Sequence, residues 1–309
     1  MKRVLVLRLS ALGDVIHTIP AVITLRDCNV SWVVEAPYRE LVELVTGVHA
    51  IPVRYRKWGK SLYASRGDIA TAVRAMQGTS ESIDFQGLVK SAVLGVLARA
   101  KTRTGFDRDA IREKPALLFT NRKVPVDTTR HVLEQNLQLV SAVTESQPLA
   151  SGSLERQGNW DAFPLNSGLD AFTNKIVFLP GAGKANKLWP TERFRELARR
   201  IGSDVIAVWG PGERELAEEI GVPLAPPTNL RELAFILQQA KVVIGGDTGP
   251  LHLATALGTK VVGLYGPTDP RRNGPYGQLD NCIDRFQTTK LMHSITVEEV
   301  MTILGRICA

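Results

Sequence analysis

Residues 245–277, GGDTGPLHLATALGTKVVGLYGPTDPRRNGPYG, carry the clearest structural signal in this chain. The apolar run Lys241–Ile244 before them is typical of a buried parallel strand, and Val261–Tyr265 is a second such run. A glycine-rich turn separates them, and Pro250 suits the first turn of a helix because it has no N–H to lose there. This order predicts an open α/β sheet, which binds ligands at the carboxyl ends of neighbouring strands.

The glycine-rich loop indicates a ligand that carries phosphate. Residues 245–249 leave backbone N–H groups uncovered, Thr248 adds a hydroxyl, and the N-terminus of the following helix attracts anions. No GxxxxGK[ST] motif is present, and Ser10–Asp14 follows the first strand where a dinucleotide fold would have GxGxxG. From this loop alone, an alternative in which the glycines only make turns stays open.

Four motifs resemble those of the lipopolysaccharide heptosyltransferases, glycosyltransferase family 9. They are Arg8–Ala21, Asp84–Ala92, Lys187–Pro190 and the block 245–277, in the order of the family. The first two are most similar to the motifs of the members that add the first heptose to the inner core. The segment Gly249–His252 (GPLH) departs from the GLSH expected of those members, which leaves the acceptor open. The resemblance implies two Rossmann-like domains facing a central cleft, the GT-B type of glycosyltransferase.

The length and the patterning also favour two domains. A chain of 309 residues suits two domains of about 150 residues each. Strands alternate with helices in both halves, which predicts parallel sheets. The polar stretch 145–172 is the best linker candidate, so we expect domains at 1–155 and 156–309, with a last helix that can pack back on the N-terminal domain. The first helix is expected over Gly13–Arg26.

Composition narrows the compartment and the partners. The three cysteines form no CxxC pattern, the chain opens without a signal peptide, and no apolar segment approaches 18 residues. Residues 1–150 hold 21 lysines and arginines against 14 acidic residues, whereas residues 151–309 hold 17 of each. The basic half favours an anionic partner, or simply carries solubilising charge. With the resemblance, this predicts a cytoplasmic monomer, peripheral on the inner face of the inner membrane.

Asp14 is the candidate catalytic base. It follows the first strand at the start of a helix, where the helix N-terminus favours the ionised form. On position alone, an N-cap is the competing interpretation. The resemblance assigns a base to this position, which would deprotonate the attacking hydroxyl in an inverting transfer without a covalent intermediate.

Donor binding is assigned to the second half. Lys187 and the N–H groups beside Pro250 are expected to neutralise the diphosphate, with Asp247 orienting Lys187 by a salt bridge; a surface lysine is the alternative, and Lys184 competes with it. The expected donor-binding residues are Ser10, Gly13, Asp247, Thr248, Gly249, Leu251, His252, Thr268 and Asp269. His252 is alternatively a structural histidine, and Thr268 with Asp269 a proline-flanked turn.

Metal and cofactor are expected to be absent, with ADP-heptose as a substrate. The only Asp-x-Asp triplet, Asp107-Arg108-Asp109, lies far in sequence from the donor block and is interpreted as a solvated turn. The positive charges of Lys187 and a helix N-terminus would replace a divalent ion at the diphosphate.

Acceptor binding is assigned to the basic half, since the resemblance implies Kdo-lipid A, which carries carboxylates and phosphates. Arg54–Lys60 packs four cations and two aromatic residues into seven positions. Such a run is usually a solvated loop and sometimes binds nucleic acid, but the resemblance favours contact with the anionic acceptor, with Trp58 and Tyr63 near the membrane surface. The expected acceptor residues are Arg54, Arg56, Lys57, Lys60, Gln86, Lys90, Arg112 and Arg130, with Lys114, Arg122 and Lys123 extending the patch. Two rivals stay open: a family transferase with another sugar or acceptor, and a non-catalytic protein that binds nucleotides or nucleic acid.

Overall fold

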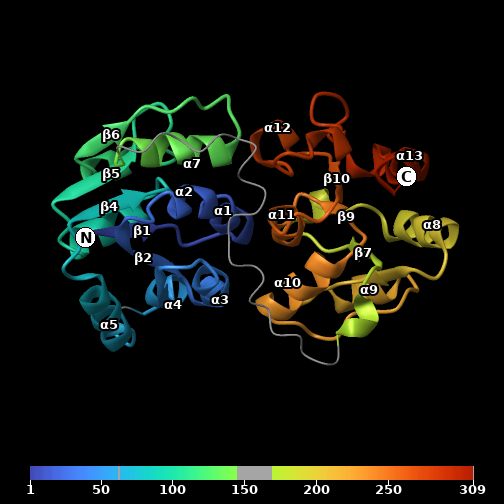
Figure 1. Ribbon diagram of the computed structural model, residues 1–309, viewed down its shortest axis with the longest axis horizontal. Helices are drawn as coiled ribbons and strands as arrows, with labels where there is room; N and C mark the ends of the chain where they lie inside the picture. Colours follow the sequence, from blue (N-terminus) through green and yellow to red (C-terminus); the bar gives the residue numbers. More distant parts are fainter. Residues whose placement is uncertain (62, 145–168, 309) are drawn as a thin grey trace. The chain divides into compact units, whose positions relative to one another are not determined.

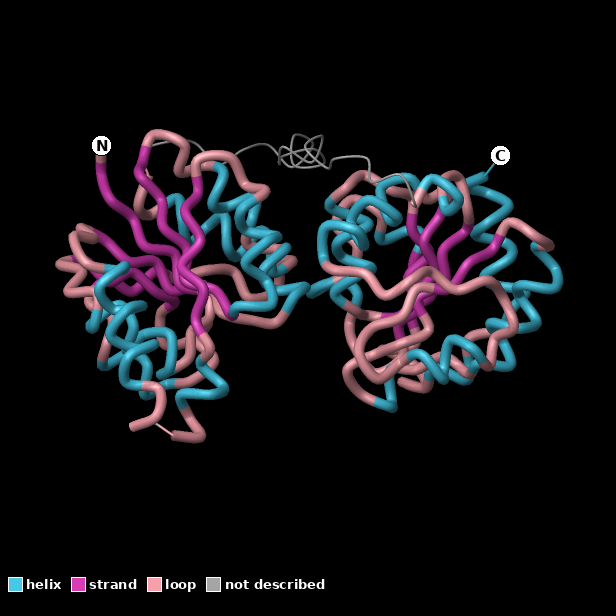
Figure 2. Tube along the Cα trace, turned by 90° about the horizontal axis from the view of Figure 1, so that it is seen from below, coloured by secondary structure: helices cyan, strands magenta, loops and turns pink. Residues whose placement is uncertain are grey.

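The computed structural model describes residues 1–61, 63–144 and 169–308, and divides into two compact units, Met1–Ala162 and Phe163–Ala309. The expected boundary at residues 155 and 156, and most of the expected linker, lie outside the described residues. Figures 1 and 2 show that each unit has a central sheet with helices on both faces.

The first unit contains a six-stranded, wholly parallel sheet in the order β3-β2-β1-β4-β5-β6. Because β1 lies between β2 and β4, the chain crosses to opposite sides of β1, which creates a topological switch point at the carboxyl end of this strand. The strands are β1 (Lys2–Leu7), β2 (Cys28–Glu35), β3 (Val48–Val53), β4 (Glu81–Asp84), β5 (Thr102–Phe106) and β6 (Arg122–Val124).

Helices cover both faces of this sheet (Figure 1). One face carries α1 (Leu12–Ile16), α2 (Ile19–Ile23) and α7 (Val132–Ser141). The other carries α4 (Tyr55–Trp58), α5 (Arg66–Met76) and α6 (Val89–Leu97), which share a core with β1, β2 and β3. The remaining helices are α3 (Arg39–Glu43) and the 3-10 turns η1 (Ala36–Tyr38) and η2 (Lys114–Leu118).

The single first helix expected over Gly13–Arg26 is wrong, because α1 and α2 are separate. Pro20 cannot donate a hydrogen bond to the carbonyl of Ile16, and its ring crowds that carbonyl in a continuous helix. The amide of Asn136 in α7 instead donates to the carbonyl of His17 at 3.0 Å and to the hydroxyl of Thr18 at 3.3 Å. These two hydrogen bonds stabilise the break between α1 and α2.

The second unit contains a five-stranded parallel sheet in the order β11-β10-β9-β7-β8. Here β7 lies between β8 and β9, so its carboxyl end is again a switch point. The strands are β7 (Ile176–Leu179), β8 (Val205–Ala207), β9 (Val242–Gly246), β10 (Val261–Tyr265) and β11 (Cys282–Asp284).

The helices of the second unit divide its core between the two faces of the sheet. α8 (Thr191–Ile201), α9 (Arg214–Glu218) and α13 (Val297–Cys308) share one buried cluster with the strands. α10 (Leu230–Gln239) and α11 (Gly249–Ala256) pack against each other, and α11 packs against β9 and β10. The remaining pieces are α12 (Pro270–Asn273), η5 (Asp170–Phe172), η6 (Ala185–Lys187), η7 (Leu279–Asn281) and η8 (Met292–Ser294).

The buried face of α13 belongs to the second unit. Val297, Val300 and Leu304 lie in the cluster that contains α8 and the sheet, and Lys260 donates to the carbonyl of Ile307. These contacts bury the apolar side chains of Val297, Val300 and Leu304 against the rest of the second unit.

Candidate active site

The carboxyl edge of the first sheet gathers polar side chains from four strands. Because β1, β3, β4 and β5 are parallel, the segments that follow them emerge at one edge. These segments carry Arg8 and Asp14 after β1, the basic segment Arg54–Lys60 after β3, Gln86 after β4 and Arg112 after β5. The edge therefore brings together most of the residues assigned from sequence to catalysis and acceptor binding.

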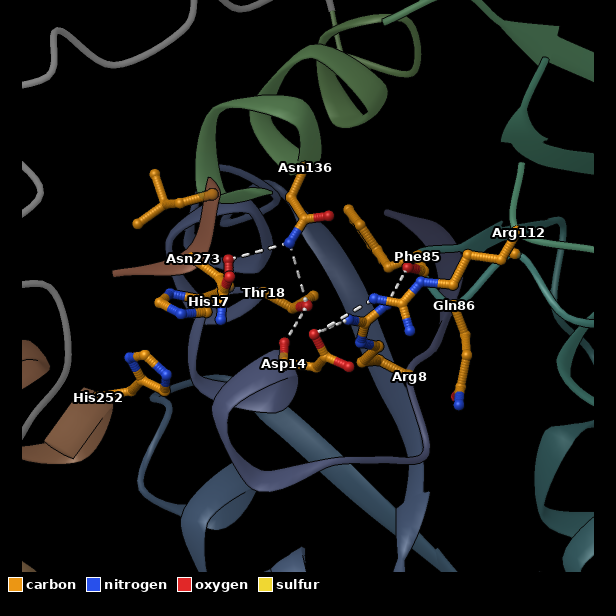
Figure 3. A network of polar contacts seen from close by, with 12 residues as sticks. Arg8, Asp14, His17, Thr18, Phe85, Gln86, Arg112, Asn136, His252 and Asn273 are labelled. Carbon is orange, nitrogen blue, oxygen red and sulfur yellow. Dashed lines mark hydrogen bonds and ion pairs between the residues drawn. The ribbon is translucent and has the colours of Figure 1, made fainter. Parts of the chain in front are cut away.

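Asp14 is the third residue of α1, and its side chain keeps 24% of its surface exposed. The N-cap is Ala11, so the N-cap interpretation of Asp14 is wrong, although the carboxylate accepts the backbone N–H of Ala11. Its Oδ1 lies 2.7 Å from Nη2 of Arg8 and 3.5 Å from Nη2 of Arg112 (Figure 3). Burial raises the pKa of Asp14, but the two guanidinium charges outweigh it and hold that pKa below its usual range.

Arg8 is fixed in the space between β1, β2 and β4. It is 1% exposed, and its second terminal nitrogen donates to the carbonyl of Phe85. Its own carbonyl accepts the indole N–H of Trp32 at 3.0 Å. Burial lowers the pKa of Arg8, which Asp14 and Asp84 oppose. An arginine directly after an apolar strand is the signal in the sequence that could have identified this residue, to which the sequence analysis assigns no role.

Asp84 orders the loop that holds Arg8. Its Oδ1 accepts the N–H groups of Gln86 and Gly87 at 2.9 and 3.1 Å, and its Oδ2 accepts the hydroxyl of Ser91 at 2.9 Å. Gly87 has φ +66°, a conformation that favours glycine. Burial raises the pKa of Asp84 to about 6, against these hydrogen bonds. Asp84 is also absent from the site residues that were expected from the sequence.

Gln86 has a structural partner. Its Oε1 accepts the backbone N–H of Leu9 at 2.7 Å, and the residue is 3% exposed. This contact joins the segment after β1 to the segment after β4, so the amide oxygen that was assigned to the acceptor already supports the loop of Arg8. Ser10 and Gly13, which were assigned to the donor, lie in the segment Ser10–Asp14 after the same strand.

The basic segment Arg54–Lys60 is helical at its centre, not a loop as expected, since α4 spans Tyr55–Trp58. Glu35, at the end of β2, accepts the N–H groups of Tyr55 and Arg56. Burial raises the pKa of Glu35, and the charges of Arg56 and Lys90 oppose it. The ammonium of Lys90 lies 5.5 Å from the ring centre of Tyr55, so this lysine joins the basic segment.

The expectation that Trp58 rests near a membrane surface is wrong. Trp58 is 5% exposed, packs in the core of the first unit and donates from its indole nitrogen to Asp68 at 3.0 Å. Tyr63 is 78% exposed, with the guanidinium of Arg66 over its ring. Trp58 and Tyr63 are close in the sequence, but the side chain of Trp58 faces the core of the first unit from α4.

The outer basic residues differ in their partners. Arg130 ion-pairs with Asp127 and Glu134, each at 3.5 Å, and Arg122 pairs with the buried Glu81 at 2.8 Å. Lys114 and Lys123 are exposed. Arg112 alone among the outer cations contacts Asp14.

The carboxyl edge of the second sheet holds Lys187 and Asp247. Nζ of Lys187 lies 2.6 Å from Oδ2 of Asp247, which confirms the expected salt bridge. Glycine at position 246 eases the packing of these two segments, because a Cβ there would lie 3.1 Å from the carbonyl oxygen of Lys187, which is tighter than most such contacts. Lys184, the competing residue, is exposed and precedes the turn η6. The switch point between β7 and β9 therefore carries the cation that the sequence placed at the diphosphate.

Asp247 has three side-chain partners. Besides Lys187, its Oδ1 contacts Nε2 of His252 at 3.1 Å and the amide of Asn273 at 2.9 Å. Burial raises the pKa of Asp247, but the hydrogen bonds and charges of His252 and Lys187 outweigh it and hold that pKa well below its usual range. The residue is therefore an anion that fixes its neighbours, and His252, 5% exposed, is positioned by this carboxylate. Asn273 was missed because it lies 26 residues away in sequence.

The N-terminus of α11 presents polar atoms at the same edge. Thr248 is the N-cap, Gly249 begins the helix, and Leu251 is fully buried in its first turn. In the described part of the chain, the buried hydroxyls of Thr248 and Thr268 have no hydrogen-bond partner. Two loops of one edge thus offer hydroxyls beside a helix N-terminus, an arrangement suited to phosphate.

Asp269 already has a structural task. Its side chain caps α12 and holds the guanidinium of Arg271 at 2.8 Å, and its side chain is 22% exposed. The proline-flanked turn considered from the sequence describes Asp269 better than a free donor contact does.

Glu213 is a further residue that the sequence analysis missed. Its carboxylate accepts the N–H of Gly210 at 2.9 Å and lies where a Cβ on Gly181 would be. Gly181 follows β7 and Gly210 follows β8, so this carboxylate also lies at the carboxyl edge. In dinucleotide-binding folds with a similar α/β topology, an acidic residue after the second strand binds a ribose hydroxyl.

The Asp-x-Asp triplet forms a turn. Oδ1 of Asp107 accepts the N–H groups of Asp109 and Ala110, each at 3.1 Å. Across residues 1–61, 63–144 and 169–308, no group of three or more His, Cys, Asp or Glu side chains is arranged to hold a metal ion. The turn interpretation of Asp107 and Asp109 is confirmed, whereas independence from metal stays a prediction.

Comparison with known proteins supplies the family. The model of glycosyltransferase family 9 (heptosyltransferase) matches residues 73–300. Lipopolysaccharide heptosyltransferase 1 of Escherichia coli strain K12 is 33% identical over 298 residues, which cover 89% of this chain and 91% of that protein. Solved structures of E. coli heptosyltransferase WaaC are each 30% identical. The structure with ADP has a TM-score of 0.87 and covers 99% of both chains. The one with ADP-2-deoxy-2-fluoro heptose has a TM-score of 0.84 and covers 98% of this chain and 99% of that one.

The fold and these matches define a glycosyltransferase with two α/β units, each of which contains a parallel sheet. This confirms the GT-B type predicted from the sequence. The chain belongs to glycosyltransferase family 9, the heptosyltransferases. Among the helices that the structure describes, none is long and apolar enough to cross a membrane.

Proposed function

We propose that this chain transfers heptose from ADP-L-glycero-D-manno-heptose to the Kdo region of Kdo-lipid A, with inversion at the anomeric carbon. The observation that carries this proposal is the partly exposed, ionised Asp14 at the carboxyl edge of a basic unit. A protein that only binds nucleotides has no need of such a carboxylate. The family and the Lys187–Asp247 pair of the second unit support a nucleotide-sugar donor.

In the proposed reaction, Asp14 accepts the proton of an acceptor hydroxyl. The hydroxyl oxygen forms a bond to the anomeric carbon while the bond from that carbon to the diphosphate breaks, and ADP leaves with the electron pair. Lys187 and the N–H groups at the start of α11 neutralise the charge that develops on the diphosphate. Glu213 accepts hydroxyls of the ribose.

The location follows from the proposed acceptor. Kdo-lipid A is held in a membrane, so we place the protein as a cytoplasmic monomer, peripheral on the inner face of the inner membrane. The net charge of +7 and the exposed cations of the first unit support contact with an anionic surface.

Mass spectrometry of the products tests the proposal. Incubation with ADP-heptose and Kdo-lipid A should add one heptosyl mass to the lipid, and NMR of the product should show the inverted anomeric configuration. ADP-mannose and lipid A without Kdo serve as matched poor substrates. Efficient transfer to another acceptor would favour a related family transferase. If no transfer occurred but the protein bound nucleotide tightly, a non-catalytic nucleotide-binding protein would be favoured.

We expect activity to survive exhaustive treatment with a chelator. Lys187 and the α11 N-terminus supply the positive potential at the diphosphate, and Asp107 uses its carboxylate for its own turn. The measurement is the initial rate with EDTA, with and without added magnesium. Loss of activity that magnesium restores would contradict this, and Asp107→Asn would then be the first variant to examine.

We expect Arg54→Ala, Arg56→Ala and Lys57→Ala together to raise the KM for the lipid acceptor several-fold. These three side chains are exposed just after β3, at the edge that carries Asp14. The effect should shrink as salt rises, since exposed charges are screened beyond about 10 Å at 0.1 M ionic strength.

The matched control replaces Arg26, Arg74 and Lys101, which are exposed and precede β2, β4 and β5 at the opposite edge. The control removes the same charge but should leave the KM for the acceptor near wild type. Calorimetry should find ADP binding unchanged in both triple variants. If the Arg54, Arg56 and Lys57 variant bound ADP more weakly and kept a normal KM for the acceptor, the assignment of donor and acceptor to the two units would be reversed.

A further inference from the structure

Asp14 is contacted by two arginines of very different burial. Arg8 is 1% exposed and reaches Oδ1 at 2.7 Å, whereas the Arg112 side chain is 41% exposed and reaches the same oxygen at 3.5 Å. Neither arginine contact ends on Oδ2 (Figure 3). The two oxygens of the carboxylate are therefore unequal: Oδ1 holds both arginine contacts, and Oδ2 holds neither.

Arg8 cannot turn away from Asp14 without breaking other contacts. Its guanidinium bridges Asp14 and the carbonyl of Phe85, so one planar group spans the segments after β1 and β4. The main chain on either side is held as well, since its carbonyl accepts the indole of Trp32 and the N–H of Leu9 donates to Gln86. A planar fork with several fixed donors suits this bridge, and an ammonium group does not reproduce it.

From this geometry we propose that Arg8 is the positioning residue of the reaction: it anchors Oδ1 of Asp14, so that Oδ2 is the oxygen that accepts the proton of the acceptor hydroxyl. The proposal rests on the assignment of Asp14 as the base. It also gives the buried position of Arg8 a purpose that packing does not require, because an apolar side chain would fill the same space at a lower desolvation cost.

The charge of Arg8 also determines when Asp14 is a base. Other charged or titratable groups around Asp14 are Arg112 after β5, Asp84 at the end of β4, and His17 and His131 beside α1 and α7. Removal of Arg8 withdraws a positive charge that favours the carboxylate, so the pKa of Asp14 should rise. As the pH is lowered, the variant should therefore lose activity at a higher pH than the wild type does. An adjacent arginine typically lowers the pKa of an aspartate by about 1–3 units.

The test compares Arg8→Gln, Arg8→Lys and Arg112→Gln, with Arg74→Gln as a surface control. Titration of the Asp14 carboxyl carbon by NMR, assigned by its absence in Asp14→Asn, reports this pKa separately from Asp84 and the histidines. Arg8→Gln should raise it by about 1–3 units and lower kcat at least tenfold. Arg8→Lys should keep the low pKa but still lower kcat, with little change in KM. Arg112→Gln should change KM for the acceptor more than kcat.

The outcomes separate this inference from the proposed function. If Asp14→Asn is inactive but Arg8→Gln leaves both the pKa and kcat unchanged, the role of Arg8 is refuted and the base remains. If Asp14→Asn is fully active, the proposed base itself fails. Should Arg8→Gln not fold, Arg8→Lys decides, since a normal kcat in that variant would overturn the positioning role.

Discussion

Asp14→Asn should lower kcat by about 10²–10⁴-fold, the usual contribution of general-base catalysis. Asparagine keeps the volume of the side chain and an oxygen that can accept from Arg8 and from the N–H of Ala11. What it removes is the negative charge and with it the ability to take the proton. The effect should therefore appear in kcat, whereas the affinity for ADP, which we assign to the other unit, should stay near wild type.

The variant needs a stability control, because Arg8 then lacks its counter-ion. Breaking a buried ion pair from one side typically costs about 3–5 kcal/mol, although Asp14 keeps 24% of its side chain exposed and Asp84 remains near Arg8. Thermal unfolding should be measured beside the kinetics, with the exposed Asp27→Asn as the matched variant. A folded Asp14→Asn protein with near-normal turnover would remove Asp14 from the mechanism.

Lys187→Met should impair both the binding and the departure of the diphosphate. The lysine Nζ lies at the switch point of the second sheet, its side chain is 22% exposed, and it is held at 2.6 Å by Asp247. Methionine preserves most of the side-chain volume and removes the charge. Removal of a single group that stabilises transition-state charge typically costs about 10²–10³-fold in kcat. We expect kcat to fall in this range and the dissociation constant of ADP to rise at least tenfold.

Lys184→Met is the matched control for Lys187. Lys184 lies three residues earlier and is exposed, and it differs from Lys187 in that no ion pair among the described residues involves it. It should retain wild-type affinity for ADP in calorimetry and a normal kcat. If Lys184→Met lost donor binding while Lys187→Met kept it, the two lysines would exchange roles, and the salt bridge to Asp247 would be purely structural.

The local elements were largely predictable because their signals lie within a few residues. The strand Val261–Tyr265 has the bounds expected from its apolar pattern, and Pro250 occupies the first turn of α11 as expected. The continuous helix expected over Gly13–Arg26 does not form, because Pro20 interrupts it although the apolar pattern continues. The basic segment was taken for a loop because its charges hid a short helix whose Trp58 turns inward.

Local patterns in the chain were enough to predict the fold class and the family, and they pointed to two candidate groups, the carboxylate of Asp14 and the ammonium of Lys187. Strand periodicity and glycine turns are local, so they can be read along the chain. The residues that surround these groups, in contrast, depend on the folded arrangement of the strands. Arg8 meets Phe85 across 77 positions and Asp14 meets Arg112 across 98, and these contacts exist because parallel strands bring their carboxyl ends to one edge. Burial then fixes Arg8 in place. The hydrogen bonds and charges of His252 and Lys187 lower the pKa of Asp247 against the effect of burial, and no spacing in the sequence reveals this, since the partners of Asp247 come from three separate segments.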